Sequence, residues 1–162
     1  MKKMDDYIYY RQLPAKRMAS GALFFDAAER FLILRPNYKK TWEIPGGVVE
    51  KDESPIQACV REVKEELDLV LDPANLPLLC LQYSIGDSIR TESLMFIFNG
   101  GFLNRKQISN LHLGSEELIE SRFMTLDESK SLLSPTLWER VKNALQARRD
   151  NRVFYFETAA TC

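Results

Sequence analysis

The sequence predicts a layered α/β domain, because short apolar segments typical of strands come before and after two amphipathic segments typical of helices. The chain has 162 residues, and a chain of this length hides roughly two thirds of its extended surface on folding. No internal repeat, low-complexity stretch or long linker divides it. We therefore expect residues 1–162 to form a single domain.

Composition and charge narrow the classes of function. Hydrophobic residues make up 45% of the chain and charged residues 28%, as in ordinary folded proteins. A formal net charge of -1 gives no broad basic field, so a nucleic-acid polymer is not an expected partner, whereas a small phosphorylated ligand is compatible. No apolar run suits a signal peptide or membrane span, and the three cysteines lack metal spacing. We expect a cytoplasmic protein without a membrane partner, and a homodimer is one option for its assembly.

The first predicted elements are two strands. Residues 18–25 and 31–35 are apolar runs separated by a polar turn, which is typical of a β-hairpin. A loop over residues 36–40 follows. Residues 42–47 then predict a brief extended piece that ends in a Pro-Gly-Gly turn.

The strongest helix signal covers residues 54–67. Ser54 suits the N-cap, and Pro55 suits the first helical position, where its missing N–H costs nothing. We expect this helix to pack on a sheet through an apolar stripe made of Ile56, Val60, Val63 and Leu67.

The second half of the chain predicts more strands and a closing helix. Strands are expected over residues 78–84, 93–98 and 121–124, with glycine-containing segments as punctuation. Residues 135–148 follow a helical pattern, with Ser134 as the cap. The apolar stripe of that helix consists of Leu137, Val141 and Leu145.

The first helix also carries an acidic arc. Glu62 lies three and four positions before Glu65 and Glu66, so the three carboxylates are predicted to converge on one point, away from the apolar stripe. Like charges at these spacings each cost an isolated helix about 0.2–0.5 kcal/mol, and Lys64 cannot neutralise all three. Hard divalent cations prefer carboxylate oxygens, so the arc is compatible with an Mg²⁺ or Mn²⁺ site. A solvated Glu-rich helix face is the alternative, and it is the commoner meaning of such a cluster taken alone.

Residues before the arc favour the metal interpretation. Gly46 and Gly47 let the backbone approach a phosphate or a metal, and Arg61 can hold a carboxylate such as Glu53 in a planar fork. From Gly47 the order is five residues, Glu53, seven residues, Arg61 and Glu62. An apolar residue, any residue and a Glu-Glu pair follow.

Residues 47–69 thereby resemble the signature of the Nudix family, with every defined position matched except one. The departure is Asp68, where the family usually has the glycine that ends the helix in a left-handed conformation. Asp enters that conformation less freely than Gly but more freely than most residues. The resemblance implies an α/β/α sandwich around a mixed β-sheet, with this helix on one side and the C-terminal helix on the other.

The resemblance also implies roles in the site. It implies metal ligation by Glu62, Glu65, Glu66 and the carbonyl of Gly46, orientation of the glutamates by Arg61, and a supporting role for Glu53. The implied reaction is Mg²⁺- or Mn²⁺-assisted hydrolysis of a diphosphate linkage. The general base lies either in the signature or on a later loop, where the candidates are Glu116, Glu117 and Glu120, with a solvated acidic loop as the alternative.

Other residues are candidates for substrate contacts. Arg35, Lys39 and Lys40 could contact phosphate oxygens, and ordinary surface charge is the alternative for them. Trp42 or Tyr38 could stack on a base, and a position in the core is the alternative for these aromatic residues. His112 and Cys59 are not expected to be catalytic. The expected substrate is a nucleoside diphosphate linked to another moiety, such as a nucleotide-sugar or an ADP-ribose-like compound. Hydrolysis of a nucleoside triphosphate is the enzymatic alternative, and nucleotide sensing without hydrolysis is the non-enzymatic one.

Overall fold

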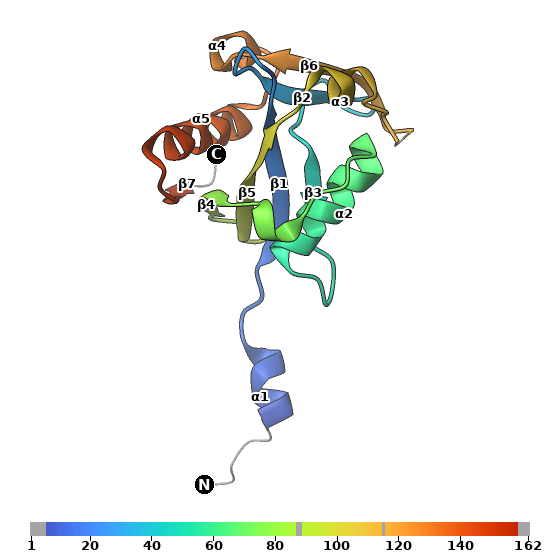
Figure 1. The fold of residues 1–162 in the computed structure, drawn as a ribbon. Coiled ribbons are helices and arrows are strands. Elements are labelled where there is room, and N and C mark those ends of the chain that lie inside the picture. The colour runs from blue at the N-terminus through green and yellow to red at the C-terminus, as the bar shows by residue number, and fades with distance from the viewer. Residues whose placement is uncertain (1–5, 87–88, 115, 159–162) are drawn as a thin grey trace, which may run out of the picture.

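Seven strands form one mixed sheet between two long helices in the computed structural model, which describes residues 6–86, 89–114 and 116–158 (Figure 1). The strands are β1 (Arg17–Phe25), β2 (Phe31–Pro36), β3 (Gly46–Val48), β4 (Leu78–Ser84), β5 (Ser93–Phe102), β6 (Leu118–Met124) and β7 (Phe154–Thr158). Their order is β6-β2-β1-β5-β4-β7, and β3 pairs with β1. The β1–β5 and β4–β7 pairs are parallel, and the others are antiparallel.

The long helices begin where the sequence predicts. Helix α2 (Pro55–Leu67) is capped by Ser54, whose side chain accepts from the Gln57 amide, and the Gln57 side chain accepts from the Ser54 amide in return. Helix α5 (Pro135–Asp150) is capped by Ser134. The shorter helices are α1 (Asp6–Gln12), η1 (Pro73–Asn75), α3 (Arg105–Ser109) and α4 (Leu126–Ser129). No helix within the described ranges is long and apolar enough to span a membrane.

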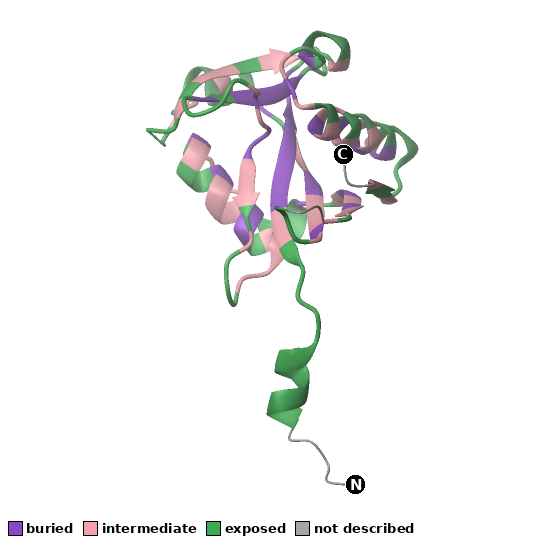
Figure 2. Ribbon diagram, turned by 180° about the vertical axis from the view of Figure 1, so that it is seen from behind, coloured by how far each residue is buried: buried purple, intermediate pink, exposed green. Residues whose placement is uncertain are grey.

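The two central strands explain the layered arrangement. Along β1, Ala22 and Phe24 face the core under α2, whereas Leu23 and Phe25 face the core under α5. A strand buried on both faces reads as a continuous apolar run rather than as an alternating pattern. Figure 2 shows β1 as a buried strand through the centre of the molecule. The expected α/β/α sandwich with a mixed sheet is therefore confirmed.

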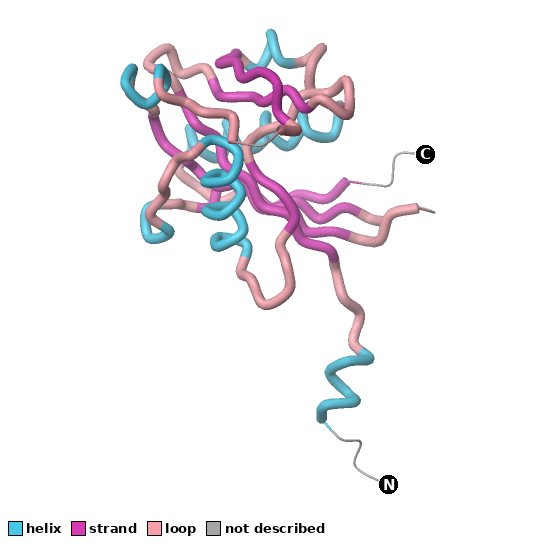
Figure 3. The backbone as a smooth tube through the Cα atoms, turned by 90° about the vertical axis from the view of Figure 1, so that its right-hand side faces the viewer, coloured by secondary structure: helices cyan, strands magenta, loops and turns pink. Residues whose placement is uncertain are grey.

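Helix α1 differs from the other elements because it is not packed into this sandwich. It contributes no buried residue, and Figure 3 shows it well away from the strands. The sequence analysis did not predict it. Since it adds nothing to either core, the packed part of the chain begins at β1.

The predicted Pro-Gly-Gly turn is wrong, and Gly100, expected beside a strand, lies within one. Gly46 and Gly47 instead belong to β3, whose backbone pairs with β1. A Cβ at Gly46 would overlap the Ser20 carbonyl oxygen, so glycine is what lets the two strands approach. Gly100 lies inside β5, where the absence of a side chain leaves room for the Phe24 ring.

The end of α2 has the geometry that the signature requires. Asp68 takes a left-handed conformation with φ 55° and ψ 24°, and its amide donates to the carbonyl of Lys64. The Asp68 carboxylate also forms an ion pair with the Lys64 ammonium, and both side chains are exposed. Aspartate thus ends the helix in the conformation for which glycine is usual.

Candidate active site

Arg61 is the centre of a hydrogen-bond network at the start of the signature. Its Nε and Nη2 donate to the two carboxylate oxygens of Glu53, at 2.9 and 3.1 Å. Its Nη1 donates to Glu62 at 2.9 Å and to Glu65 at 3.3 Å. Nη2 also reaches the carbonyl of Val48 at 3.1 Å, which ties helix α2 to strand β3.

Glu53 acts on Arg61 rather than on the helix carboxylates. Its side chain accepts from Arg61 and from the amide of Glu50, and these hydrogen bonds hold its pKa below the ordinary value. Glu53 raises the pKa of the Arg61 guanidinium in turn, so that charge is permanent. Glu53 is therefore placed to position the Arg61 guanidinium.

Strand β3 fixes two of the three helix glutamates. The amide of Gly46 donates to Glu66 Oε2 at 2.9 Å. Glu62 lies so close to Gly47 that a Cβ there would overlap its carboxylate. Gly46 and Gly47 thus allow the backbone of strand β3 to lie directly against the acidic arc.

The sequence predicted that the three helix carboxylates converge on one point, but in the structure they do not. Glu62 and Glu65 bond to Arg61, whereas Glu66 turns to the Gly46 amide. Across the described residues, no three Asp, Glu, His or Cys side chains form a group that could hold a metal ion. The cause is local, because Glu62 and Glu65 share Nη1 of Arg61, whereas the Gly46 amide holds Glu66 apart from that pair.

The chemistry of this donor set nevertheless suits a hard divalent cation. The pKa of Glu66 is raised to about 8, chiefly by burial and also by the neighbouring carboxylates of Glu62, Glu43 and Glu65, against the opposing Gly46 hydrogen bond. A partly buried carboxylate among three others is repelled, and a cation with oxygen ligands relieves that repulsion. Glu62, Glu65 and Glu66 would have to turn from these N–H donors before they could hold Mg²⁺ or Mn²⁺ together.

A cavity of about 250 Å³ opens beside Glu66. Gly46, Gly47 and Glu66 line its inner end, and Tyr38 and Lys39 line it from the loop after β2. Cavities that hold small ligands usually have volumes of roughly 300–1,000 Å³, so this one is small on its own. It places a ligand-sized space directly against the acidic arc.

The predicted substrate contacts separate in the structure. Lys39 lines this cavity and forms an ion pair with Glu43 at 2.6 Å, whereas Arg35 lies on β2 and pairs with Glu120 at 3.4 Å. Trp42 is only 4% exposed and packs in the core under α5, with Arg122 5.0 Å from its ring. A buried ring cannot stack on a base, so Trp42 does not have the predicted stacking role and is a core residue instead. Tyr38, 65% exposed, is the aromatic side chain at the cavity.

The later acidic residues also differ from one another. Glu120 lies on β6 and bonds to Arg122 at 2.6 Å, and the hydrogen bonds from Arg122 and then Arg35 lower its pKa. Such pairing makes Glu120 a weak base. Glu117 is exposed and directly precedes Leu118, which lines the cavity, and nearby in the chain the Gly114 amide donates to the Glu66 carbonyl.

Two residues of the site were missed by the sequence analysis. Glu43 lines the cavity and raises the pKa of Glu66, and Arg140 of α5 lines the same cavity. Arg140 stands three positions after Leu137 and one before Val141, on the buried side of its helix. A charged residue within an apolar stripe was the available signal.

The residues set aside from catalysis lie outside this network. Cys59 lies on the buried face of α2, and burial raises its pKa to about 12, so its thiol is not a nucleophile near neutral pH. His112 is exposed on the loop before β6. Neither residue lines the cavity beside Glu66.

Comparison with known proteins points to one family. A family model described as the NUDIX domain matches residues 15–147. The mRNA-decapping enzyme subunit 2 of Saccharomyces cerevisiae is 32% identical over 59 residues, which cover 36% of this chain and 6% of that protein. The chain therefore spans only a small part of the length of the curated relatives that it matches.

Solved structures share the fold over most of the chain. A UDP-X diphosphatase superimposes with a TM-score of 0.71 and 18% identity, covering 96% of this chain and 76% of that one. An ADP-ribose pyrophosphatase from Streptococcus suis gives a TM-score of 0.61 and 21% identity, covering 89% of this chain and 100% of that one. At these identities the similarity establishes the fold.

Proposed function

This chain belongs to the Nudix family, and from that premise we propose that it hydrolyses a diphosphate linkage in a nucleoside diphosphate joined to another moiety, with Mg²⁺ or Mn²⁺ as cofactor. The observation that carries the proposal is the Arg61 hydrogen-bond network. It connects Glu53, Glu62 and Glu65 to strand β3, which lies beside the Glu66 cavity. Two free buried thiols, Cys59 and Cys80, suit the reducing cytoplasm.

The substrate class has support from the structural neighbours. The UDP-X diphosphatase and the ADP-ribose pyrophosphatase are named for substrates in which a nucleoside diphosphate carries a second group. Besides Glu66, the cavity is lined by Met95 and Arg140, so a group beyond the diphosphate would contact residues outside the acidic arc. We therefore favour a nucleotide-sugar or an ADP-ribose-like substrate over a simple triphosphate.

Glu62, Glu65 and Glu66 would hold the cation, and the Gly46 carbonyl is proposed as a further ligand. A bound divalent cation would supply positive charge for the diphosphate oxygens and would make water more acidic. Arg61 orients Glu62 and Glu65, and the Gly46 amide orients Glu66. Lys39, at the mouth of the cavity, is placed to bind a phosphate oxygen.

We assign the removal of a proton from the attacking water to the loop that carries Glu117. That loop is anchored to α2 through Gly114 and reaches the cavity at Leu118, so its carboxylate can approach a bound substrate. Glu120, committed to two arginines, is proposed as a structural residue of β6 instead. Glu117→Gln should lower turnover and leave Mg²⁺ affinity unchanged, whereas Glu120→Gln should change neither.

The experiment that tests the function is a panel of nucleotides with a magnesium titration. Nucleotide-sugars, ADP-ribose and nucleoside triphosphates are incubated with the protein, and the products are separated by chromatography. We expect cleavage between the two phosphorus atoms of a diphosphate-linked compound, with a rate that depends on Mg²⁺ and falls to zero in EDTA. Preference for a triphosphate would change the substrate class. Tight binding of a nucleotide without any turnover would favour a sensing module.

A further inference from the structure

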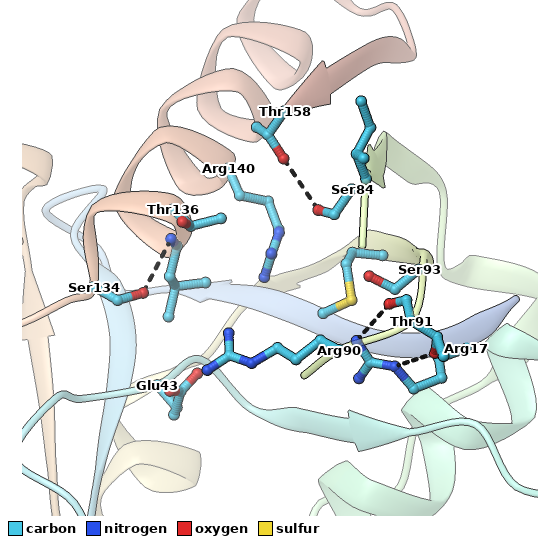
Figure 4. A pocket seen from close by; sticks show the side chains of 13 residues that line it. Arg17, Glu43, Ser84, Arg90, Thr91, Ser93, Ser134, Thr136, Arg140 and Thr158 are labelled. Atoms are coloured by element: carbon cyan, nitrogen blue, oxygen red, sulfur yellow. Dashed lines mark hydrogen bonds between the residues drawn. The ribbon is translucent and has the colours of Figure 1, made fainter. Parts of the chain in front are cut away.

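A second cavity, of about 400 Å³, adjoins the site (Figure 4). It shares four lining residues with the cavity beside Glu66, namely Glu43, Met95, Leu137 and Arg140. The two cavities therefore lie next to each other at these four residues. A ligand with its diphosphate at the acidic arc can extend past Arg140 into the second space.

The lining of this second cavity is rich in positive charge. Arg17, Arg90 and Arg140 line it, and Glu43 is the one carboxylate among its lining residues that the structure describes. In Figure 4, Arg90 extends toward Glu43, while Arg140 comes from helix α5 above them. Glu43 is shared with Lys39, its ion-pair partner at 2.6 Å. The cavity thus has more cationic than anionic groups.

Arg140 is held in place by a neutral partner. Its Nε donates to the side-chain oxygen of Gln82, which is fully buried. The Gln82 amide nitrogen in turn donates to Thr158 at 2.8 Å and to Ser84 at 3.2 Å. Within the described ranges Arg140 has no carboxylate in an ion pair, and burial lowers the pKa of its guanidinium. Its charge is therefore poorly solvated and not neutralised by a direct partner.

Arg17 has a similar arrangement at the other end of the cavity. Its Nε donates to the Thr91 hydroxyl at 3.1 Å and its Nη2 to the Thr91 carbonyl at 3.0 Å. Both partners are neutral, and the described residues offer Arg17 no ion pair. Hydroxyl groups of Ser93 and Thr136 also line the space. Planar guanidinium groups with hydroxyl donors are the usual means of binding phosphate.

We propose that this cavity binds a phosphate group that the substrate carries in addition to the diphosphate. The inference rests on the proposed function, because it places the diphosphate at Glu62, Glu65 and Glu66. The Ser134 end of α5 also lines the cavity, and the positive end of that helix dipole adds to the attraction of an anion. Preferred substrates are therefore diphosphate compounds with a separate phosphomonoester.

Two commercial ligand pairs that differ by one phosphomonoester test this. Coenzyme A is compared with dephospho-coenzyme A, and NADP⁺ with NAD⁺, by calorimetric titration in EDTA so that binding is measured without hydrolysis. In at least one pair we expect the phosphorylated member to bind roughly tenfold more tightly. Arg140→Gln and Arg17→Gln should remove most of that preference. Arg149→Gln, on the exposed side of α5, is the matched control and should retain it.

The outcomes separate this inference from the proposed function. Equal affinities within both pairs, or an undiminished preference in Arg17→Gln and Arg140→Gln, would overturn the phosphate site even if the protein hydrolyses diphosphates. A preference that depends on the arginines supports the site, and parallel assays with Mg²⁺ then test hydrolysis by itself. Because Arg140 is packed against Gln82, circular dichroism checks its variant. Should that variant unfold, exposed Arg17 decides the result.

Discussion

Arg61 binds both carboxylate oxygens of Glu53, with Nε 2.9 Å from Oε1 and Nη2 3.1 Å from Oε2. This two-point contact fixes the plane of the guanidinium, and the remaining nitrogen then reaches Glu62 and Glu65. One arginine thus sets the positions of two proposed metal ligands. The arrangement depends on the planar fork, which lysine does not possess.

Arg61→Lys should therefore lower activity although it keeps the positive charge. An ammonium cannot bind both oxygens of Glu53 and still hold Glu62, so the carboxylates lose their orientation. We expect turnover to fall by about 10- to 100-fold, as for other residues that orient metal ligands. Steady-state kinetics measure the effect, with Arg149→Lys as a control on the exposed side of α5. Activity within twofold of wild type would show that charge alone is sufficient.

Gly47→Ala should damage the site and spare the fold. The atoms nearest to the new Cβ would be those of the Glu62 carboxylate, the end of a flexible side chain that can rotate away at little cost to stability. Moving that carboxylate should weaken Mg²⁺ binding by about 10-fold or more. Gly46→Ala is the contrast, because φ of 140° and the Ser20 carbonyl oppose any side chain there. We expect a clear fall in melting temperature for Gly46→Ala alone, and the reverse pattern would contradict the packing described for β3.

Magnesium binding should release a proton below pH 8. The pKa of Glu66 is raised from 4.5 to about 8, so near pH 6.5 the metal-free protein holds a proton there that a cation must displace. Affinity should rise with pH and level off above about pH 8. Calorimetry in two buffers with different ionisation enthalpies measures the proton directly. Identical binding enthalpies in both buffers at pH 6.5 would contradict the raised pKa.

The same shift predicts how the stability of the metal-free protein changes with pH. Between pH 4.5 and about 8 the folded state holds a proton that the unfolded chain has lost. The contribution of Glu66 to the free energy of unfolding therefore falls as pH rises through this window. Glu66→Gln should reduce that dependence in thermal melts recorded in EDTA. A melting curve that changes with pH equally in both proteins would exclude Glu66 as its source.

Asp68→Gly should be close to neutral. Glycine enters the left-handed region without steric cost, but the substitution also removes the exposed ion pair with Lys64, and exposed pairs contribute little. We expect the melting temperature to stay within about 2 °C and turnover to be unchanged. A larger loss of stability would mean that the Lys64 contact matters more than its exposure suggests.

Much of the fold could be predicted because each main element has a local signal. Apolar runs indicated β1 and β2, and Ser54 with Pro55 indicated the start of α2. Strand β7 was missed, although Phe154 and Phe156 alternate with the exposed Tyr155 and fall on the core side. Gly46 and Gly47 were mistaken for a turn because their pairing with β1 is a tertiary contact that no local pattern encodes.

The candidate site was predictable only in part for the same reason. Helical spacing places Glu65 near Arg61, four positions earlier, and Glu62 is the next residue in the chain, so both relationships are local. Glu43 and Arg140 come together with Glu66 only after α5 packs on the sheet, so spacing along the chain cannot reveal their cavity. Burial of Trp42 was likewise decided by packing of residues distant in sequence.

The most direct test of the metal-hydrolase account is the Mg²⁺-dependent turnover of Glu66→Gln on the best substrate of the nucleotide panel. Glutamine keeps the size of the side chain and can still accept from the Gly46 amide, but it lacks the charge that a hard cation needs. The account predicts a fall in turnover of about 100-fold or more, with an unchanged circular dichroism spectrum. Glu139→Gln, on the exposed side of α5, is the control and should retain wild-type activity. Equal turnover by wild type and folded Glu66→Gln would contradict it.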